Sequence, residues 1–243
     1  MKQFAIIGVS KFGFRVMEEL SQIDCEILII DKDREVIEKL KDRVSYSYIA
    51  DVLNEETIRK LVPATVDAAI VDLGDRTEAS ILVTNYLKKI GVSRIIAKAE
   101  TDEHGEILEI VGATHVIFPN REAAKRLTPM IAFSHLFNYL PISNGLIIAE
   151  IKVPAKHVGM SLIEADFRRA YKFNVIALRK ADDEEAGYLF FDPDYRLQGN
   201  DVLLVAGNEE DLSGLVSDAP IKKRTAINRL FHNLMRRDRK GGR

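Results

Sequence analysis

The sequence predicts an α/β fold: a doubly wound parallel sheet, followed by a small α+β domain and a basic helical tail. Three observations predict it. Short apolar runs alternate with helical patterns, a glycine-bearing turn joins the first run to a helix, and the composition is that of a globular protein. Apolar residues make up 47% and charged residues 30% of the 243 residues, as in soluble globular chains. This length suggests one or two domains, and we expect two.

Six short apolar runs are the strand candidates, and helical patterns separate them. The runs are residues 4–7, 26–30, 46–49, 68–71, 94–97 and 116–118. Asp33, Asn54 and Asp75 are suited to cap the helices that follow them, and Pro63 ends the third helix. Right-handed crossovers then give a doubly wound sheet, which binds its ligand at the carboxyl ends of the strands, where the strand order reverses.

The turn after the first strand, residues 8–13, reads Gly-Val-Ser-Lys-Phe-Gly. In the Rossmann dinucleotide-binding unit the first glycine makes the turn, the second admits the pyrophosphate and the third lets helix pack on strand. Ser10 stands at the second position, where its side chain opposes close approach but its hydroxyl can donate to a phosphate oxygen. The amides between Gly8 and Gly13 would meet phosphate at a helix N-terminus, beside the charge of Lys11. The alternative is a turn without a ligand.

Asp31 follows the last glycine of this turn by eighteen residues. An acid at that interval meets the ribose hydroxyls, and its charge disfavours a 2′-phosphate. The sequence therefore favours NAD, ADP or ATP over NADP, although Lys32 and Arg34 are basic neighbours. A helix-capping role for Asp31 is the alternative.

Further polar residues lie at the ends of later strands. Asp51 ends the third strand, where adenine commonly lies, and Asp72, Leu73 and Gly74 end the fourth, beside the phosphates and ribose. A carboxylate at position 72 repels phosphate unless it holds a metal or a ribose hydroxyl, so a triphosphate is less favoured than NAD or ADP. Lys98, at the end of the fifth strand, either offsets that charge or is a solvated lysine.

The sequence contains no catalytic motif. Its five histidines form no His-x-x-x-His pair, and we expect them to be scattered over the surface. Cys25 is the only cysteine, which excludes an intrachain disulfide and a cysteine zinc cluster. No stretch approaches the roughly 20 apolar residues of a membrane span. We therefore expect a cytoplasmic protein that is not an enzyme, with no catalytic or metal-ligating residues.

Residues 120–140 show a long, apolar-rich helical pattern, interpreted as a connector helix that ends at a domain boundary in residues 141–145. Either a subunit partner or the second domain would cover its apolar surface. Beyond it, strands are predicted at 146–153, 174–179 and 202–206, with a helical pattern over 161–171. This unit of about seventy residues is smaller than the usual catalytic half of a dehydrogenase, and it fits a sensor or assembly module.

The last 22 residues, 222–243, carry a net charge of +8, whereas residues 1–221 carry −10. Five apolar residues of this tail recur at the spacing of one helix face: Ile227, Leu230, Phe231, Leu234 and Met235. Such a basic amphipathic helix fits anionic lipid, an acidic protein surface, or the acidic body of the chain itself. It lacks the interleaved aromatic platforms of RNA binders, so no nucleic acid is expected.

Taken in order, these segments resemble the KTN/RCK (TrkA-N plus TrkA-C) regulatory subunits of Trk/Ktr-type potassium uptake systems. The matching segments are residues 8–13, 30–31, 50–54, 70–75, 78–80, 97–99, 158–162, 175–179 and 197–207. The resemblance implies an RCK_N domain over residues 1–118, a crossover connector helix over 119–145 and an RCK_C domain over 146–216, with the basic tail at 217–243 outside the family pattern.

The resemblance further implies a nucleotide-sensing subunit that works without catalysis. Such subunits form dimers and an octameric ring at the inner face of the cell membrane, beneath a potassium channel or transporter subunit of TrkH/KtrB type. Exchange of NAD(H) or ADP/ATP reshapes the ring, and the tail would contact the membrane or the transporter. The rival hypotheses are an NAD-dependent oxidoreductase and a sensor for another membrane partner.

The resemblance also assigns roles to individual residues. Residues 8–12 would line the phosphates, Asp31 the ribose, residues 51–52 the adenine, and residues 73–74 with Lys98 the remaining ribose or second nucleotide. Lys11 matches a basic position that in some members reaches a terminal phosphate across the dimer. Ser10 replaces the usual glycine, and Asn120 replaces a divalent-cation carboxylate, so no metal is expected. The candidate nucleotide-binding residues are Gly8, Val9, Ser10, Lys11, Phe12, Gly13, Asp31, Lys32, Asp51, Val52, Asp72, Leu73, Gly74 and Lys98.

Overall fold

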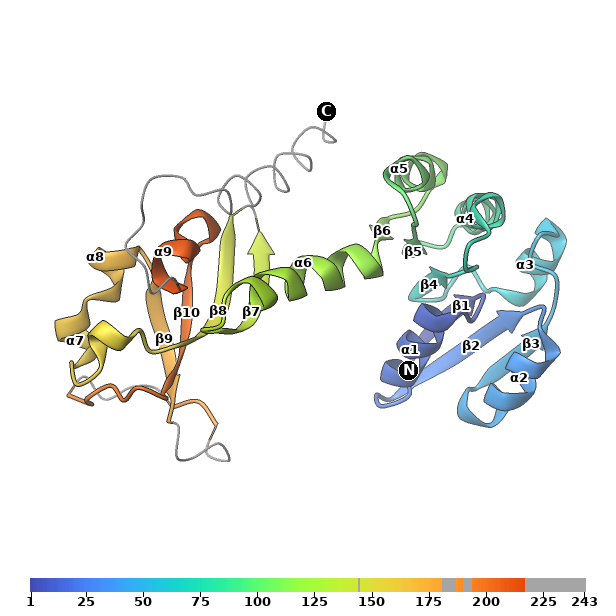
Figure 1. Cartoon of the computed structure of the whole chain (residues 1–243). Helices are drawn as coiled ribbons and strands as arrows, with labels where there is room; N and C mark the ends of the chain where they lie inside the picture. Colours follow the sequence, from blue (N-terminus) through green and yellow to red (C-terminus); the bar gives the residue numbers. More distant parts are fainter. Residues whose placement is uncertain (144, 181–186, 190–193, 217–243) are drawn as a thin grey trace. The chain divides into compact units, whose positions relative to one another are not determined.

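The computed structural model of the chain describes residues 1–143, 145–180, 187–189 and 194–216 (Figure 1). It divides into two compact units, Met1–Glu122 and Ala123–Arg243, which are considered separately. The predicted basic tail, residues 217–243, lies outside the described residues. Within the described part, no helix combines the length and apolarity needed to cross a bilayer.

The first unit is built on a six-stranded, all-parallel sheet with the order β3-β2-β1-β4-β5-β6 (Figure 1). Its strands are β1 (Lys2–Ile7), β2 (Cys25–Asp31), β3 (Tyr46–Ile49), β4 (Ala68–Val71), β5 (Ile95–Lys98) and β6 (His115–Ile117). All six predicted strands are present, and the doubly wound parallel sheet is confirmed. The order reverses between β1 and β4, which puts the ligand-binding edge at the carboxyl ends of these two strands.

Five helices connect these strands, and two of the three predicted caps are present. They are α1 (Lys11–Leu20), α2 (Arg34–Leu40), α3 (Glu55–Leu61), α4 (Thr77–Ile90) and α5 (Asp102–Val111). Asp33 caps α2 by accepting from the N–H of Glu35, and Asn54 caps α3. The prediction for Asp75 was wrong by one residue, because Arg76 occupies the N-cap position of α4.

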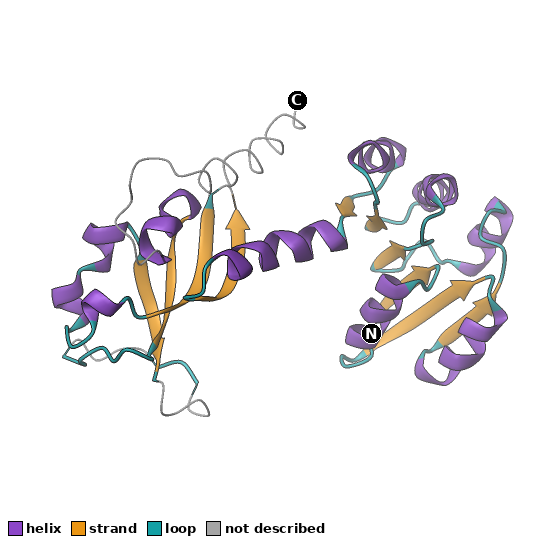
Figure 2. Cartoon of the chain, in the orientation of Figure 1, coloured by secondary structure: helices purple, strands orange, loops and turns teal. Residues whose placement is uncertain are grey.

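The period-two alternation of the central strands divides the core between the two faces of the sheet. Figure 2 shows the strands of this unit and the helices that connect them. On one face, Ile6 and Ile29 are fully buried with Met17 of α1 and residues of α2. On the other face, Ile7 and Ile30 pack with residues of α3, α4 and α5. Strands buried on both faces read as continuous apolar runs, which is why the sequence located them well.

The predicted connector helix over residues 120–140 is wrong in its last third. Helix α6 (Pro119–Ala132) ends early, and the segment Leu136–Ser143 is strand β7, paired antiparallel with β8 (Leu146–Lys152). The apolar residues of this stretch satisfied a helical period, but pairing with β8 buries Leu136 and Tyr139 on one face of a sheet. Tertiary pairing overrides local periodicity here. The two compact units meet after Glu122, which differs from the predicted boundary at 141–145.

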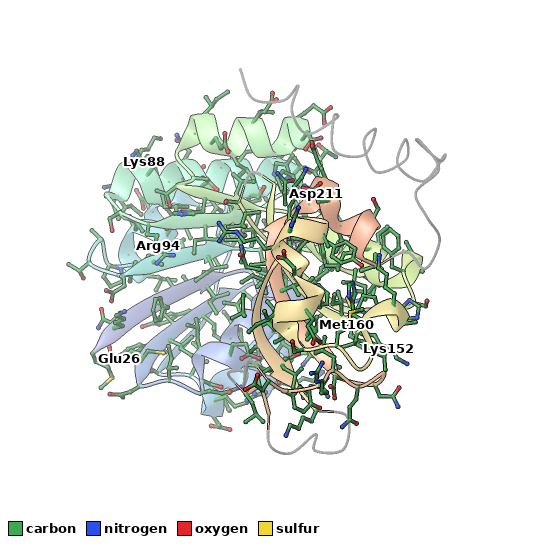
Figure 3. All side chains as sticks on the ribbon, turned by 90° about the vertical axis from the view of Figure 1, so that its left-hand side faces the viewer. Glu26, Lys88, Arg94, Lys152, Met160 and Asp211 are labelled. Carbon is green, nitrogen blue, oxygen red and sulfur yellow. The ribbon has the colours of Figure 1, made fainter. Side chains whose placement is uncertain are left out.

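The second unit is a four-stranded antiparallel sheet with the order β7-β8-β10-β9, which confirms the small α+β domain. Strands β9 (Asn174–Arg179) and β10 (Val202–Asn208) match the predicted runs. Among its described residues are also helices α7 (Leu162–Ala165), α8 (Phe167–Tyr171) and α9 (Leu212–Val216). The helical pattern predicted over 161–171 is thus two short helices, separated by Asp166 at φ 37°. Met160 precedes α7, and Asp211 precedes α9 and pairs with Lys172 at 3.1 Å (Figure 3).

Candidate nucleotide-binding site

Gly8 and Gly13, at the first and third glycine positions of the motif, are required because other backbone atoms lie too close for a side chain. Gly8 has φ +80°, and a Cβ there would lie 2.3 Å from the carbonyl oxygen of Asp72. A Cβ on Gly13 would lie 2.9 Å from the carbonyl oxygen of Gly8. The absence of a side chain at both positions lets the start of α1 lie close to the ends of β1 and β4. This is the geometry that the glycine spacing predicts for a phosphate loop.

The loop presents backbone N–H groups at the start of α1. Val9 donates to Oδ2 of Asp31 at 2.8 Å and Gly13 donates to Oδ2 of Asp72 at 2.7 Å, so these two amides are used within the protein. No hydrogen bond within the described residues engages the N–H groups of Ser10, Lys11 and Phe12. Three such amides at the positive end of a ten-residue helix suit an anion. The exposed Lys11 adds a full positive charge.

Asp31 ends β2 directly beside this loop. Its Oδ2 accepts from Val9, its Oδ1 accepts from the N–H of Asp33 at 2.9 Å, and its side chain remains half-exposed. The helix cap is Asp33, so the alternative role of Asp31 as the capping residue is wrong. Each carboxylate oxygen keeps lone-pair capacity for a ribose hydroxyl. Lys32, the next residue, is exposed.

Asp51 and Val52 follow β3, and the structure separates their roles. Asp51 is exposed, and its Oδ1 accepts from the N–H of Leu53 at 3.0 Å, which fixes the turn. The side chain of Val52 is 3% exposed and belongs to the core. Any contact of Val52 with an adenine ring therefore runs through its main chain, whereas the Asp51 side chain is accessible.

Asp72 differs most from the sequence-based expectation. The carboxylate is fully buried beneath the loop and accepts from the hydroxyl of Ser10 and from the N–H groups of Gly13 and Gly74. The sequence suggested a Ser10 hydroxyl free for phosphate and an Asp72 facing the ligand. Instead, the two side chains satisfy each other. Leu73, which follows, is 6% exposed and packs close to Gly8.

Lys98 is an interior ion-pair partner, so the alternative of a solvated lysine is wrong. Its Nζ lies 2.7 Å from Oε1 of Glu100 and 3.5 Å from Oδ1 of Asp72, and the side chain is 14% exposed. Burial lowers the pKa of Lys98, but the hydrogen bond to Glu100 and the charges of Asp72 and Glu100 outweigh it and raise the pKa overall. Lys98 therefore stays charged and neutralises the buried carboxylate of Asp72.

A small pocket of about 50 Å³ lies beyond Lys98, at the ends of β5 and β6. Its lining is Lys98, Ala99, Glu100, Phe118, Pro119, Asn120 and Arg121. Arg121 stacks on Phe118 at 4.1 Å and pairs with Asp102 at 2.6 Å. A volume of this size holds water rather than a nucleotide. A nucleotide at this edge of the sheet would therefore lie across the open strand ends.

Two histidines contradict the expected surface positions. His104 is 4% exposed and His157 is 7% exposed. Nε2 of His104 lies 2.8 Å from Oγ of Ser80, and Nδ1 accepts from the N–H of Glu100 at 3.3 Å. Sequence analysis missed this network, although Ser80 falls on the buried face of α4. The described part of the chain contains no cluster of three or more metal-ligating side chains.

Known protein families match both units of the chain. The family model described as the TrkA-N domain matches residues 4–119, and that of the TrkA-C domain matches residues 146–217. Ktr system potassium uptake protein C of Bacillus subtilis (strain 168) is 30% identical over 212 residues, covering 87% of this chain and 95% of the relative. Ktr system potassium uptake protein A of Vibrio alginolyticus is 26% identical over 214 residues, covering 87% and 95%.

Among solved structures, the GsuK RCK domain superposes with a TM-score of 0.63 at 17% identity, covering 90% of this chain and 48% of that one. The GsuK channel bound to NAD superposes with a TM-score of 0.63 at 16% identity, covering 93% and 42%. This chain thus spans less than half the length of either structure. At these identities the likeness shows the fold alone.

The fold and site define a class of protein: a parallel Rossmann-type unit, with a glycine-bearing loop after β1 and an acid at the end of β2, joined to a small antiparallel domain. Together with the two family models and the near-complete alignment to the Bacillus subtilis protein, they identify the family. The chain belongs to the KTN/RCK regulatory subunits of Ktr-type potassium uptake systems.

Proposed function

We propose that this chain is the cytoplasmic, nucleotide-sensing regulatory subunit that gates a membrane potassium channel or transporter of TrkH/KtrB type. The alignment to the Ktr uptake proteins supports it, because it covers nearly the whole length of those relatives. The chain would reach the inner face of the membrane through that partner. An octameric ring of dimers is part of the proposal.

The observation that carries the nucleotide-binding part is the position of Asp31 beside the free amides of the loop after β1. One bond from Val9 joins the acid to the loop, and the N–H groups of Ser10, Lys11 and Phe12 remain for phosphate. Ribose on the acid and phosphate on the amides is the arrangement that this fold uses for nucleotides. NAD(H), ADP and ATP all carry these two groups. The GsuK channel, which shares the fold, is described as bound to NAD.

The two units would have the separate functions that the resemblance implies. Residues 1–118 would bind the nucleotide, residues 119–145 would connect, and residues 146–216 would serve assembly or sensing. A nucleotide can shift such a ring only by binding one conformation more tightly than another. The bound nucleotide therefore acts as a signal, and the partner responds to the ring.

The rival hypothesis is an NAD-dependent oxidoreductase. The two buried histidines are poor proton-transfer candidates, because both have a pKa lowered by burial and each ring is held by a neighbouring hydroxyl. Incubation of the full chain with NADH and a panel of carbonyl substrates tests this. Absence of NADH oxidation is expected, and turnover would overturn the regulatory proposal.

The direct test is calorimetric titration of the full chain with NAD, NADH, ADP and ATP, followed by potassium uptake measurements. The wild-type chain and its Asp31→Ala variant would be expressed with a Ktr-type membrane subunit in cells that lack their own potassium uptake. We expect uptake with wild type and a loss of nucleotide dependence with the variant. If no nucleotide binds, or if potassium uptake is the same with and without the chain, the proposal fails.

We further propose that the basic tail holds the subunit at the anionic inner membrane surface. Residues 222–243 carry nine basic residues and one acid, a density that favours acidic lipid headgroups. Co-sedimentation with phosphatidylglycerol vesicles, compared with phosphatidylcholine vesicles, tests it. Wild type should bind only the anionic vesicles, and a chain lacking 222–243 should bind neither. Equal binding by the two chains contradicts a membrane role.

A further inference from the structure

A single hydrogen bond between side chains joins the two halves of the candidate site. Ser10, in the loop after β1, donates from Oγ to Oδ2 of Asp72, which follows β4. β1 and β4 are neighbouring parallel strands, and the strand order reverses between them. In this fold a dinucleotide passes from one half of the sheet to the other at that point. The bridge between Ser10 and Asp72 therefore lies where such a ligand has to cross.

This bridge completes the hydrogen bonding of Asp72. The carboxylate is 0% exposed, and its Oδ2 accepts from Ser10 and from the N–H of Gly13 at 2.7 Å. Its Oδ1 accepts from the N–H of Gly74 at 3.4 Å and faces Nζ of Lys98 at 3.5 Å. A carboxylate has about four lone-pair sites, and four donors surround this one. Asp72 can accept from a ribose hydroxyl only if one of these donors leaves.

The two halves of the site therefore differ in what they offer a ligand. On the β1–β2 side, Asp31 is half-exposed, and the amides of Ser10, Lys11 and Phe12 have no hydrogen-bond partner among the described residues. On the β4–β5 side, Lys98 is held between Glu100 and Asp72. The first half offers hydrogen-bonding groups for one adenosine and its phosphates. The second riboside of a dinucleotide would meet polar groups that are already paired.

We propose that Ser10 is a specificity-determining residue of this site: its hydroxyl locks Asp72 and so selects a nucleoside diphosphate over a dinucleotide. The inference rests on the nucleotide binding proposed above. Residue 10 stands at the motif position where this fold brings the backbone close to the pyrophosphate, and both ligands carry a pyrophosphate, so its Cβ should affect the two ligands alike. The hydroxyl acts differently, because it controls whether Asp72 can accept from a second ribose.

The experiment separates the hydroxyl from the Cβ by calorimetric titration of the full chain with ADP and with NADH. Wild type should bind ADP more tightly than NADH. Ser10→Ala removes the hydroxyl alone, and we expect the ratio of the NADH Kd to the ADP Kd to fall by about threefold to tenfold, the worth of one hydrogen bond. Ser10→Gly should lower the ratio equally and also tighten both ligands, because the backbone becomes accessible to pyrophosphate.

Ser21→Ala is the matched control, because its hydroxyl is bonded to the carbonyl of Glu18 at the far end of α1. It should leave the ratio unchanged, and thermal unfolding should show all variants folded. A wild-type chain that prefers NADH, or a ratio unchanged in both Ser10 variants, overturns the role of Ser10 while nucleotide binding stands. If neither nucleotide binds any of the chains, the proposed function fails and the selection by Ser10 fails with it.

Discussion

The backbone N–H of Val9 donates to Oδ2 of Asp31 at 2.8 Å, and this bond ties the end of β2 to the glycine loop after β1. A second bond ties the loop to the same strand, because the N–H of Gly8 donates to the carbonyl of Ile30 at 2.8 Å. The same carboxylate thus orients the loop and is the group proposed to bind the ribose. Positioning of the loop and the proposed ribose binding would be joined in one side chain.

Replacing Asp31 with Ala should weaken ADP binding at least about tenfold, because two hydroxyl contacts and the anchor of the loop are lost together. Calorimetric titration measures the loss. The matched control is Asp33→Asn, two residues on, which alters the N-cap of α2. It should leave ADP affinity within about twofold, since asparagine caps a helix as well as aspartate does. Unchanged ADP affinity in Asp31→Ala would show that the ribose lies elsewhere.

Gly8 and Gly91 both have positive φ but differ in the space around them. A Cβ at Gly8 would lie 2.3 Å from backbone oxygen, whereas a Cβ at Gly91 meets nothing within 4 Å. We expect Gly8→Ala to lower the free energy of unfolding by about 3 kcal/mol or more, from strain and overpacking together. Gly91→Ala should cost about 1 kcal/mol, from backbone strain alone. Urea denaturation of both variants measures the difference, and equal losses would contradict the contact between Gly8 and Asp72.

Local signals in the sequence were enough to predict the first unit. Each buried strand is a continuous apolar run, and Asp33 and Asn54 mark helix starts by side-chain chemistry that acts over two or three residues. The order Gly8, Gly13, Asp31 likewise lies within one strand–helix–strand unit. These features depend on neighbours in the sequence, and a single chain shows them.

What the sequence did not show depends on contacts between distant residues. Ser10 and Asp72 are 62 positions apart, so no local pattern reveals that their side chains are bonded. Strand β7 had a helical period, and only its pairing with β8 makes it a strand. His104 resembles any isolated histidine until the fold brings Ser80 against it. Each of these three errors arose where tertiary contacts decide between two locally acceptable states.

The ion pair between Lys98 and the buried Asp72 should be strongly coupled. Lys98→Met removes the only cation that contacts Asp72 in the described part of the chain, and we expect a loss of about 3 kcal/mol in the free energy of unfolding. Asp72→Asn should lose stability as well, but the double variant should lose less than the two single losses added together. Denaturant unfolding of the four chains completes this cycle.

Lys89→Met is the control for removing a lysine, since Lys89 and its partner Glu55 are both partly exposed to solvent, unlike the buried Asp72. It should change stability far less than Lys98→Met. Additive losses in the cycle would mean that Ser10, Gly13 and Gly74 satisfy Asp72 without help from Lys98.

The buried pair of Ser80 and His104 makes stability depend on pH. With Nδ1 accepting from Glu100, the ring proton lies on Nε2 and is donated to Oγ of Ser80 at 2.8 Å. A second ring proton would face the Glu100 N–H. Burial lowers the pKa of His104, and the negative charge of Glu100 opposes this without reversing it. The unfolded chain binds a proton near pH ~6.5. As pH falls through that value, protons favour the unfolded state, and stability drops.

Urea unfolding at pH 7.5 and 5.5 measures this effect through the difference between the two unfolding free energies. His104→Gln should reduce that difference, whatever its effect on absolute stability, because the variant has no proton to bind at this position. Part of the difference should remain, since burial also lowers the pKa of His157. The exposed His115 supplies the control, and His115→Gln should leave the difference as in wild type. If His104→Gln shows the full wild-type difference, then the imidazole of His104 binds its proton as readily in the fold as in the unfolded chain.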